Sequence, residues 1–270
     1  MEKQTFSEKL KAGKFVITSE IGPPKGTNIE PHLKEAEHIR DKIDAFNVTD
    51  LQSSVMRLGS LATCRLLIER GMEPVFQITC RDRNRLALQS DLLSAYVLGV
   101  RNVLCLTGDH TTLGDHPDAK PVFDLDAVSL LKVATDLMNG KDMKGNELDG
   151  KPEFFPGAVV SPGYEPVELQ IIKMEKKIEA GAKFFQTQAV YDLNSFEKFM
   201  KMVEKYNVPI LGGIVLLKSA GMAKYMNEKV AGVSVPDRYI NMMAQAKKEE
   251  RVKVSVQIAA ELIKGMKNLC

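Results

Sequence analysis

The chain alternates short apolar runs with longer amphipathic segments, and this alternation limits the folds open to it. Seven runs rich in β-branched and apolar residues predict strands, at 14–21, 45–50, 75–80, 102–108, 154–160, 183–190 and 208–217. Segments with apolar residues every three or four positions predict helices, at 30–43, 56–70, 85–99, 126–138, 165–181, 192–206, 219–229, 236–248 and 253–268. Continuously apolar strands that alternate with helices favour a parallel sheet covered by helices.

Two architectures fit this order of elements. A (β/α)₈ barrel needs an eighth strand, and none follows the last helix, which runs into Cys270. An open, doubly wound sheet is the alternative. No Gly-x-Gly-x-x-Gly follows the first strand, so a dinucleotide-binding Rossmann domain has no direct support.

Composition excludes several classes of protein. The formal net charge is +2, from 37 basic and 35 acidic residues, which gives no reason to expect nucleic acid or a membrane surface as a partner. No apolar run is long enough to span a bilayer, and residues 1–14 lack the apolar core of a secretory signal. The scattered cysteines, without a Cys-x-x-Cys pair, argue against a metal site or a disulfide framework; they are Cys64, Cys80, Cys105 and Cys270. These features predict a cytoplasmic protein.

Polar residues gather where the predicted strands end, which is where a barrel carries its chemistry. A single polar residue there is more often a turn or a helix cap, but all seven units share the feature. Glu20 ends the first strand and Asp109 follows the fourth, so both would face one mouth, as a site for a polar heterocycle requires. The remaining residues at these ends include Thr49, Asp50, Gln77, Thr79, Arg81, Thr107, Gly108, Ser161, Gln186, Thr187, Gln188 and Lys218.

The stretch CLTGDHTTLGDH, residues 105–116, holds two Gly-Asp-His triplets. Its Asp and His side chains are possible metal ligands, but a loop of Asp, Gly, Thr and Pro is the usual composition of an exposed connection. We therefore predict no metal site, and only Asp109 stands where a functional barrel residue belongs. Elsewhere, His32 and His38 are expected at the surface, and the aromatic residues Phe123, Tyr164 and Tyr191 are expected in the core rather than against a cofactor.

Several stretches together resemble the methylenetetrahydrofolate reductase family, in the family's order and spacing. They are SEIGPPKG (19–26), NVTDLQSS (47–54), FQITCRDRNR (76–85), LCLTGDH (104–110), KKIEAGAKFFQTQAVYD (176–192) and LGGIVLLKSAGMAKYM (211–226). The last stretch and the later VPD are most similar to a short form from anaerobes, which works with a separate iron–sulfur or zinc subunit.

The resemblance implies a TIM barrel, one domain over residues 1–270, that carries a flavin. The implied reaction reduces methylenetetrahydrofolate to methyltetrahydrofolate by hydride transfer from flavin N5, in one-carbon metabolism, where the methyl branch of acetyl-CoA formation is one possible place for it. Glu20 falls on the general acid, whose pKa an apolar mouth would raise. Asp109 falls on a carboxylate that would lower the flavin potential and stabilise an iminium cation. Gln188 falls on the amide that binds the pterin.

The same resemblance assigns the cofactor contacts and shows where this chain departs from the family. The implied contacts are Thr49, Gln77, Thr107, Gly108, Asp109, Phe123, Asp124, Ser161, Gln170 and Lys177. Gln77, Thr107 and Ser161 replace His, Arg and Tyr of better-known members, which leaves FAD and FMN both open. Met226 replaces an aromatic residue that stacks on nicotinamide and folate, which favours electrons from a partner subunit over direct use of NADH.

The eighth strand of the family is absent from this sequence. Either the native chain extends further, or a partner covers the open edge, because unpaired strand edges are usually covered; an oligomer is expected. Two other functions stay open. One is a non-catalytic flavin scaffold in an electron-transfer complex. The other is a barrel lyase that forms a Schiff base, for which Lys218 is the poorly placed candidate.

Overall fold

The computed structural model describes residues 4–230 and 232–269, which pack as two compact units. The first unit comprises Met1–Ala158 with Lys177–Lys183, and the second comprises Val159–Lys176 with Phe184–Cys270. The assignment of residues 1–270 to one domain therefore stays a prediction.

Seven strands follow one another in chain order, as the sequence predicts. The pairs β1/β2, β2/β3, β3/β4 and β4/β5 of the first unit and β6/β7 of the second are parallel. Together with the intervening helices they confirm the TIM-barrel class, and residues 4–230 and 232–269 contain no eighth strand. The strands are β1 (Thr18–Ile21), β2 (Ala45–Val48), β3 (Pro74–Thr79), β4 (Asn102–Leu106), β5 (Phe155–Val160), β6 (Phe184–Ala189) and β7 (Ile210–Gly213).

The helices also occupy the predicted segments, with shorter ends. They are α2 (Glu30–Ile39), α3 (Ser60–Glu69), α4 (Arg85–Val97), α5 (Ala127–Met138), α6 (Val167–Glu179), α7 (Leu193–Val203), α8 (Ala220–Lys229), α9 (Asp237–Gln245) and α10 (Arg251–Met266). Single 3₁₀ turns are η1 (Arg40–Lys42), η2 (Gln52–Ser54), η3 (Thr111–Leu113) and η4 (Glu204–Tyr206). The sequence analysis missed α1 (Phe6–Lys11), which begins with a capping box between Thr5 and Glu8.

Two predicted boundaries are wrong, and hydrogen bonds explain the one at the start of α3. Helix α3 begins at Ser60 rather than at residue 56, because the backbone N–H of Met56 donates to Asp115 (2.9 Å) and that of Leu58 to the Pro24 carbonyl (2.8 Å). These bonds keep the segment before Gly59 extended. Strand β7 ends at Gly213, four residues before the predicted end.

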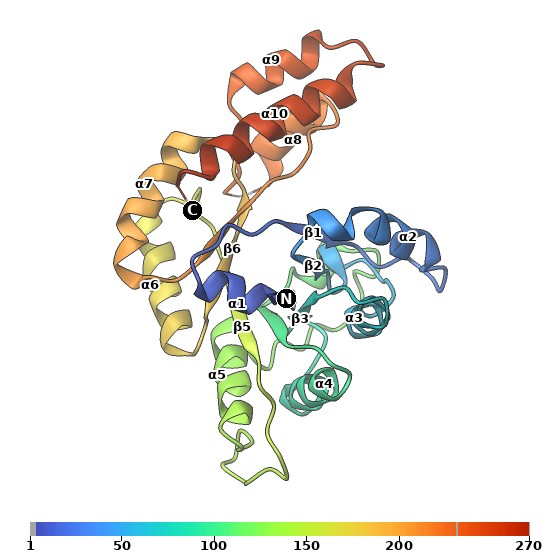
Figure 1. Cartoon of the computed structure of the whole chain (residues 1–270), viewed down its shortest axis with the longest axis vertical. Coiled ribbons are helices and arrows are strands. Elements are labelled where there is room, and N and C mark those ends of the chain that lie inside the picture. The colour runs from blue at the N-terminus through green and yellow to red at the C-terminus, as the bar shows by residue number, and fades with distance from the viewer. Residues whose placement is uncertain (1–3, 231, 270) are drawn as a thin grey trace. The chain divides into compact units, whose positions relative to one another are not determined.

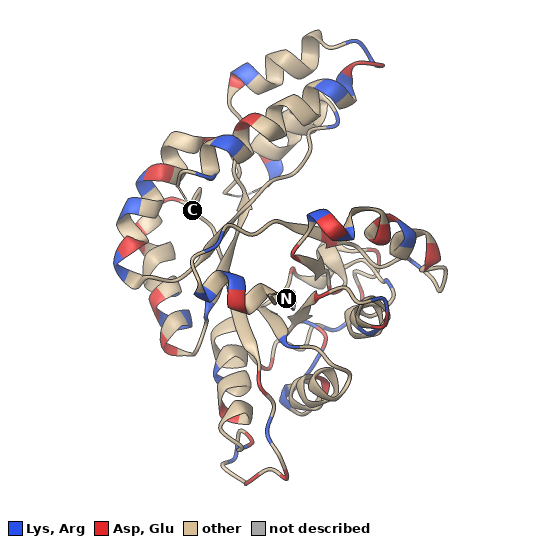
Figure 2. Cartoon of the chain, viewed as in Figure 1, with Lys and Arg blue, Asp and Glu red and all other residues tan. Residues whose placement is uncertain are grey.

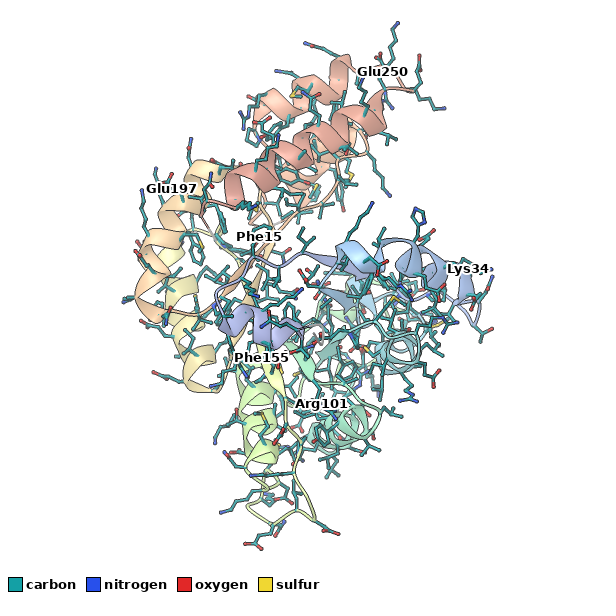
Figure 3. The ribbon with its side chains drawn as sticks, viewed as in Figure 1. Phe15, Lys34, Arg101, Phe155, Glu197 and Glu250 are labelled. Atoms are coloured by element: carbon teal, nitrogen blue, oxygen red, sulfur yellow. The ribbon has the colours of Figure 1, made fainter. Side chains whose placement is uncertain are left out.

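The core of the first unit surrounds β2 and β3, whose residues are all buried. Helix α3 packs on β2 and β3, α5 packs on β4, and α4 lies beside α5 (Figure 1). Helix α1 closes the amino-terminal end of these strands. The Phe6 N–H donates to Glu73 (2.9 Å), and the Phe6 ring meets the edge of Phe155, which is labelled in Figure 3, with ring centroids 6.3 Å apart.

In the second unit, α8, α9 and α10 share an apolar core that includes Tyr191, Leu217, Met226, Tyr239 and Leu262. Charged residues of both signs are spread along the outer helices, such as α2 and α7 (Figure 2), as the near-zero net charge predicts. None of the described helices is both long enough and apolar enough to cross a membrane.

Candidate active site

Glu20 lies on the short edge strand β1, opposite Asn47 of β2. Its Oε1 accepts a hydrogen bond of 3.3 Å from the Gln52 amide. Although the side chain reaches solvent, protein atoms crowd the carboxyl group, and this burial raises its pKa above the ordinary value. The Gln52 hydrogen bond acts in the opposite sense and is weaker. A carboxyl with a raised pKa can hold and deliver a proton near neutral pH.

Thr49 follows β2 and is 2% exposed, yet its Oγ1 has no hydrogen-bond partner. A buried hydroxyl without a partner costs free energy, so such a group in a folded protein calls for a ligand or an ordered water. Gly22, which follows β1, places no side chain beside this hydroxyl; a Cβ there would lie 3.8 Å from Oγ1. Thr49 is thus suited to bind a ligand at the carboxyl ends of β1 and β2.

Asp50 and Thr79, which the sequence analysis placed among the residues of the mouth, serve the fold. The Asp50 side chain is fully buried and accepts hydrogen bonds from the N–H and hydroxyl of Thr79 (both 2.9 Å) and from Arg83 (2.7 Å). Arg81 is 2% exposed, and its guanidinium donates to the carbonyls of Leu51 and Asp109 (both 3.2 Å). It therefore ties the loop after β2 to the loop after β4.

The loop after β4 begins with Thr107, Gly108 and Asp109. Gly108 has φ +93°, and a Cβ there would lie 3.1 Å from side-chain atoms of Arg81 and Thr79, so only glycine fits without strain. The Thr107 hydroxyl accepts from the Ala127 N–H at the start of α5 (3.1 Å). Among the described residues, no hydrogen bond or ion pair engages the exposed carboxylate of Asp109. That carboxylate is available to a ligand.

Behind this loop lies an open cavity of about 490 Å³. Four of the predicted cofactor contacts line it, namely Thr107, Gly108, Phe123 and Asp124. The other lining residues are His110, Leu125, Asp126 and Ser129. Phe123 has φ +40° and stacks on the His110 ring, with centroids 6.1 Å apart and planes inclined by 22°. It is half-buried rather than in the core, so the expectation of a core position is wrong for Phe123.

The carboxyl groups around the cavity differ in the hydrogen bonds that they already accept and in the direction of their pKa shifts. Both carboxylate oxygens of Asp124 already accept hydrogen bonds from Arg85 (2.8 Å), which lower its pKa to about 2. Asp126 caps α5. Burial raises its pKa, but the hydrogen bonds from Ser129 and the positive charge of Lys177 outweigh burial and lower it overall. Gln77 is 9% exposed on β3, at the same end of the strands.

The second unit holds the remaining predicted site residues. Gln188 is exposed at an irregularity in the β6/β7 pairing between Gln186 and Ala189, and such bulges turn a side chain toward a site. Ser161, after β5, and Gln170, on α6, are half-buried. Met226 is 7% exposed in the apolar core, where its sulfur lies 3.7 Å from the Tyr191 hydroxyl. Tyr191 is a core residue as expected, whereas Tyr164 is 40% exposed, contrary to expectation.

Hydrogen bonds within the segment 105–116 and to residues of the loops after β1 and β2 fix its conformation. The His110 side chain caps η3, and Asp115 binds Lys25, the His116 ring and the Met56 N–H. The Lys25 hydrogen bond is the main reason that the pKa of Asp115 is lowered. Within the described residues, no group of three His, Cys, Asp or Glu side chains is placed to hold a metal ion. None of β1–β7 contains a lysine, and the exposed Lys218 lies five residues beyond the end of β7.

The strand–helix repeat, with carboxyl and hydroxyl groups at the carboxyl ends of its strands, places this chain in the TIM-barrel class. The family model "Methylenetetrahydrofolate reductase" matches residues 5–269, and the chain belongs to that family.

Named relatives agree with the family. "Methylenetetrahydrofolate reductase 2" of Schizosaccharomyces pombe is 25% identical over 280 residues, which cover 95% of this chain but 42% of the relative. "5,10-methylenetetrahydrofolate reductase" of Pectobacterium carotovorum is 25% identical over 260 residues, which cover 93% of this chain and 81% of the relative. The chain thus spans less than half of the first relative's length and most of the second's.

A similar fold is found in a solved structure of a Clostridium thermocellum protein, described as binding two copies of 5-methyl-5,6,7,8-tetrahydrofolic acid. It is 18% identical, with a TM-score of 0.64 over 97% of this chain and 87% of its own. At this identity the likeness concerns the fold alone.

Thr49→Val tests whether the buried hydroxyl serves a ligand. Because Oγ1 has no partner in the protein, we expect the free energy of unfolding without ligand to stay the same or to rise slightly. If Oγ1 binds the flavin that the family resemblance implies, flavin affinity should fall about five- to tenfold, the effect of one lost hydrogen bond. Flavin titration followed by fluorescence measures this. Ser255→Ala is the matched control, because it removes another buried, unpartnered hydroxyl on α10 and should leave flavin affinity unchanged. Equal affinities for Thr49→Val and the unaltered protein would show that the hydroxyl does not contact flavin.

Proposed function

We propose that this chain reduces methylenetetrahydrofolate to methyltetrahydrofolate, with a bound flavin as the hydride donor. The observation that carries the proposal is the family match over residues 5–269, which spans every candidate site residue from Glu20 to Met226. The raised pKa of Glu20 and the unengaged carboxylate of Asp109 support it, because the reaction needs a proton donor and a negative charge near a developing cation.

The first unit contains groups that fit a flavin. The unpartnered Thr49 hydroxyl can bind a polar ring edge. The cavity beside Thr107 and Phe123 is large enough for part of the cofactor. Lys177 carries a positive charge close enough to affect Asp126 and is a candidate for a phosphate group. When bound, the flavin supplies a hydride to the substrate.

Glu20 supplies the proton in this scheme. It protonates the nitrogen whose bond to the bridging methylene carbon breaks, and the five-membered ring opens to an iminium cation. The Asp109 carboxylate stabilises that cation electrostatically. The hydride then converts the methylene carbon to a methyl group, so the substrate gains one proton and one hydride in total. We assign binding of the pterin to Gln188, whose exposed amide can both donate and accept.

Electrons reach the flavin from a separate iron–sulfur or zinc subunit in this proposal. Position 226 of α8 carries methionine instead of an aromatic side chain that could stack on nicotinamide. This methionine is buried in the apolar core. The described cysteines Cys64, Cys80 and Cys105 are buried free thiols, in keeping with the reducing cytoplasm. The proposed place in metabolism is one-carbon transfer, including the methyl branch of acetyl-CoA formation.

The cofactor can be identified directly. We expect the purified protein to be yellow, with a flavin absorption spectrum, and mass spectrometry of the released cofactor to decide between FAD and FMN. If the protein is colourless, it should bind one of the two flavins when they are added. A protein that binds neither would contradict the proposal and favour a function without flavin.

A further inference from the structure

The turn after β2 has an unusual backbone. Leu51, Ser53 and Ser54 all have left-handed conformations, with φ of 47°, 55° and 59°. Residues other than glycine rarely adopt this region, and when they do so close together the surrounding structure must hold them there. Gln52 is part of this turn, and it is the residue whose amide reaches Glu20.

Three contacts hold the turn. The buried Arg81 guanidinium donates to the Leu51 carbonyl, at the start of the turn. The Ser54 carbonyl packs against Gly114, where a Cβ would lie only 1.8 Å from the oxygen. The Met56 N–H binds Asp115, which the Lys25 ammonium also engages. Because these contacts come from loops after β1, β3 and β4, the turn is fixed by the same elements that carry the candidate site.

The surroundings of Glu20 make Gln52 its specific partner. Its neighbour across the strands is Asn47, which is neutral and donates to Thr18 (3.1 Å). Burial raises the pKa of Glu20, and the hydrogen bond from the Gln52 amide acts in the opposite sense. Among the described residues no ion pair engages the Glu20 carboxyl group. A single neutral donor therefore sets both the direction of the carboxyl group and its hydrogen bonding.

We propose that Gln52 is a positioning residue for Glu20, which the strained turn presents to the carboxyl group. This role rests on the proposed function in one respect, namely that Glu20 is the proton donor. The hydrogen bond from Gln52 holds Oε1 of Glu20 toward residues 51–54 and leaves the other carboxyl oxygen for the substrate. Arg81 holds the turn through Leu51 and the loop after β4 through Asp109, so both acids depend on one buried guanidinium.

Gln52→Met and Gln52→Lys test the proposal with effects of opposite sign. An N–H donor favours the ionised carboxylate, so its removal in Gln52→Met should raise the Glu20 pKa further. The alkaline limb of the kcat/KM profile, where Glu20 loses its proton, should move to higher pH, and the plateau should fall about fivefold with the lost hydrogen bond. Gln52→Lys places a positive charge there and should move the limb to lower pH. A purely structural role would lower the plateau without moving the limb.

A readout without turnover keeps this test separate from the proposed reaction. ¹³C NMR of labelled glutamate in the flavin-loaded protein should show the Glu20 titration at higher pH in Gln52→Met and at lower pH in Gln52→Lys. Gln257→Met, on the exposed face of α10, is the matched control and should titrate like the unaltered protein. An unchanged Glu20 titration in both Gln52 variants would overturn the proposal. Absence of turnover in the unaltered protein would instead contradict the proposed function, while the NMR result would still decide the role of Gln52.

Discussion

Glu20→Gln should lower the rate of methylenetetrahydrofolate reduction by about 10²- to 10⁴-fold, the usual contribution of a positioned general acid. Glutamine keeps the size of the side chain but cannot deliver a proton at neutral pH. Flavin binding should be retained, because Glu20 contacts Gln52 and not the Thr49 hydroxyl or the cavity beside Thr107. Single-turnover oxidation of the reduced flavin by the substrate measures the chemical step.

Two controls make this prediction specific. Glu147→Gln changes an exposed carboxyl in the 139–153 segment and should leave the rate unchanged. The flavin absorption spectrum of Glu20→Gln should match that of the unaltered protein. If Glu20→Gln reduces the substrate at the unaltered rate, Glu20 is not the proton donor.

Asp50→Ala should destabilise the protein by about 3–5 kcal/mol, the effect of removing one partner from a buried ion pair. The Asp50 side chain is completely buried, and its loss leaves both donors of Thr79 without their acceptor. Arg83 loses one of its two carboxylate partners and keeps Asp91. Urea unfolding followed by circular dichroism gives the free energy of unfolding.

The matched comparison is Asp136→Ala, which removes an exposed ion pair with Lys132 on α5. Surface pairs of this kind contribute less than about 1 kcal/mol. A loss for Asp50→Ala as small as that for Asp136→Ala would mean that the buried pair does not stabilise the fold.

The strand–helix order was predictable because the apolar period differs between strands and amphipathic helices. Each of the seven strands lies inside its predicted segment, except that β3 begins one residue earlier, at Pro74. Errors occur where tertiary hydrogen bonds decide the backbone, as at Met56, whose N–H is taken by Asp115 far along the chain. Helix α1 was missed because its six residues are too few to show a clear period.

The candidate site was predictable in part. Glu20, Thr49 and Asp109 could be named from the sequence because strand ends in a parallel sheet share one edge. The structure places them at or beyond the ends of β1, β2 and β4, and their roles stay predictions. The same rule wrongly included Asp50, since a sequence cannot show that Arg83 and Thr79 engage it. Gln52 and Arg81 carry no sequence signal for their roles, because their contacts depend on left-handed turns and on loops distant in the chain.

We propose that a flavin in this protein passes a hydride to methylenetetrahydrofolate. Chemically reduced viologen, added without oxygen in an amount just sufficient to reduce the flavin-loaded protein, prepares it for a single turnover; the substrate is then added, and flavin absorption and folate products are followed together. We expect return of the oxidised flavin spectrum with one methyltetrahydrofolate formed per flavin. A flavin that stays reduced in the presence of substrate, with no methyltetrahydrofolate formed, would contradict it.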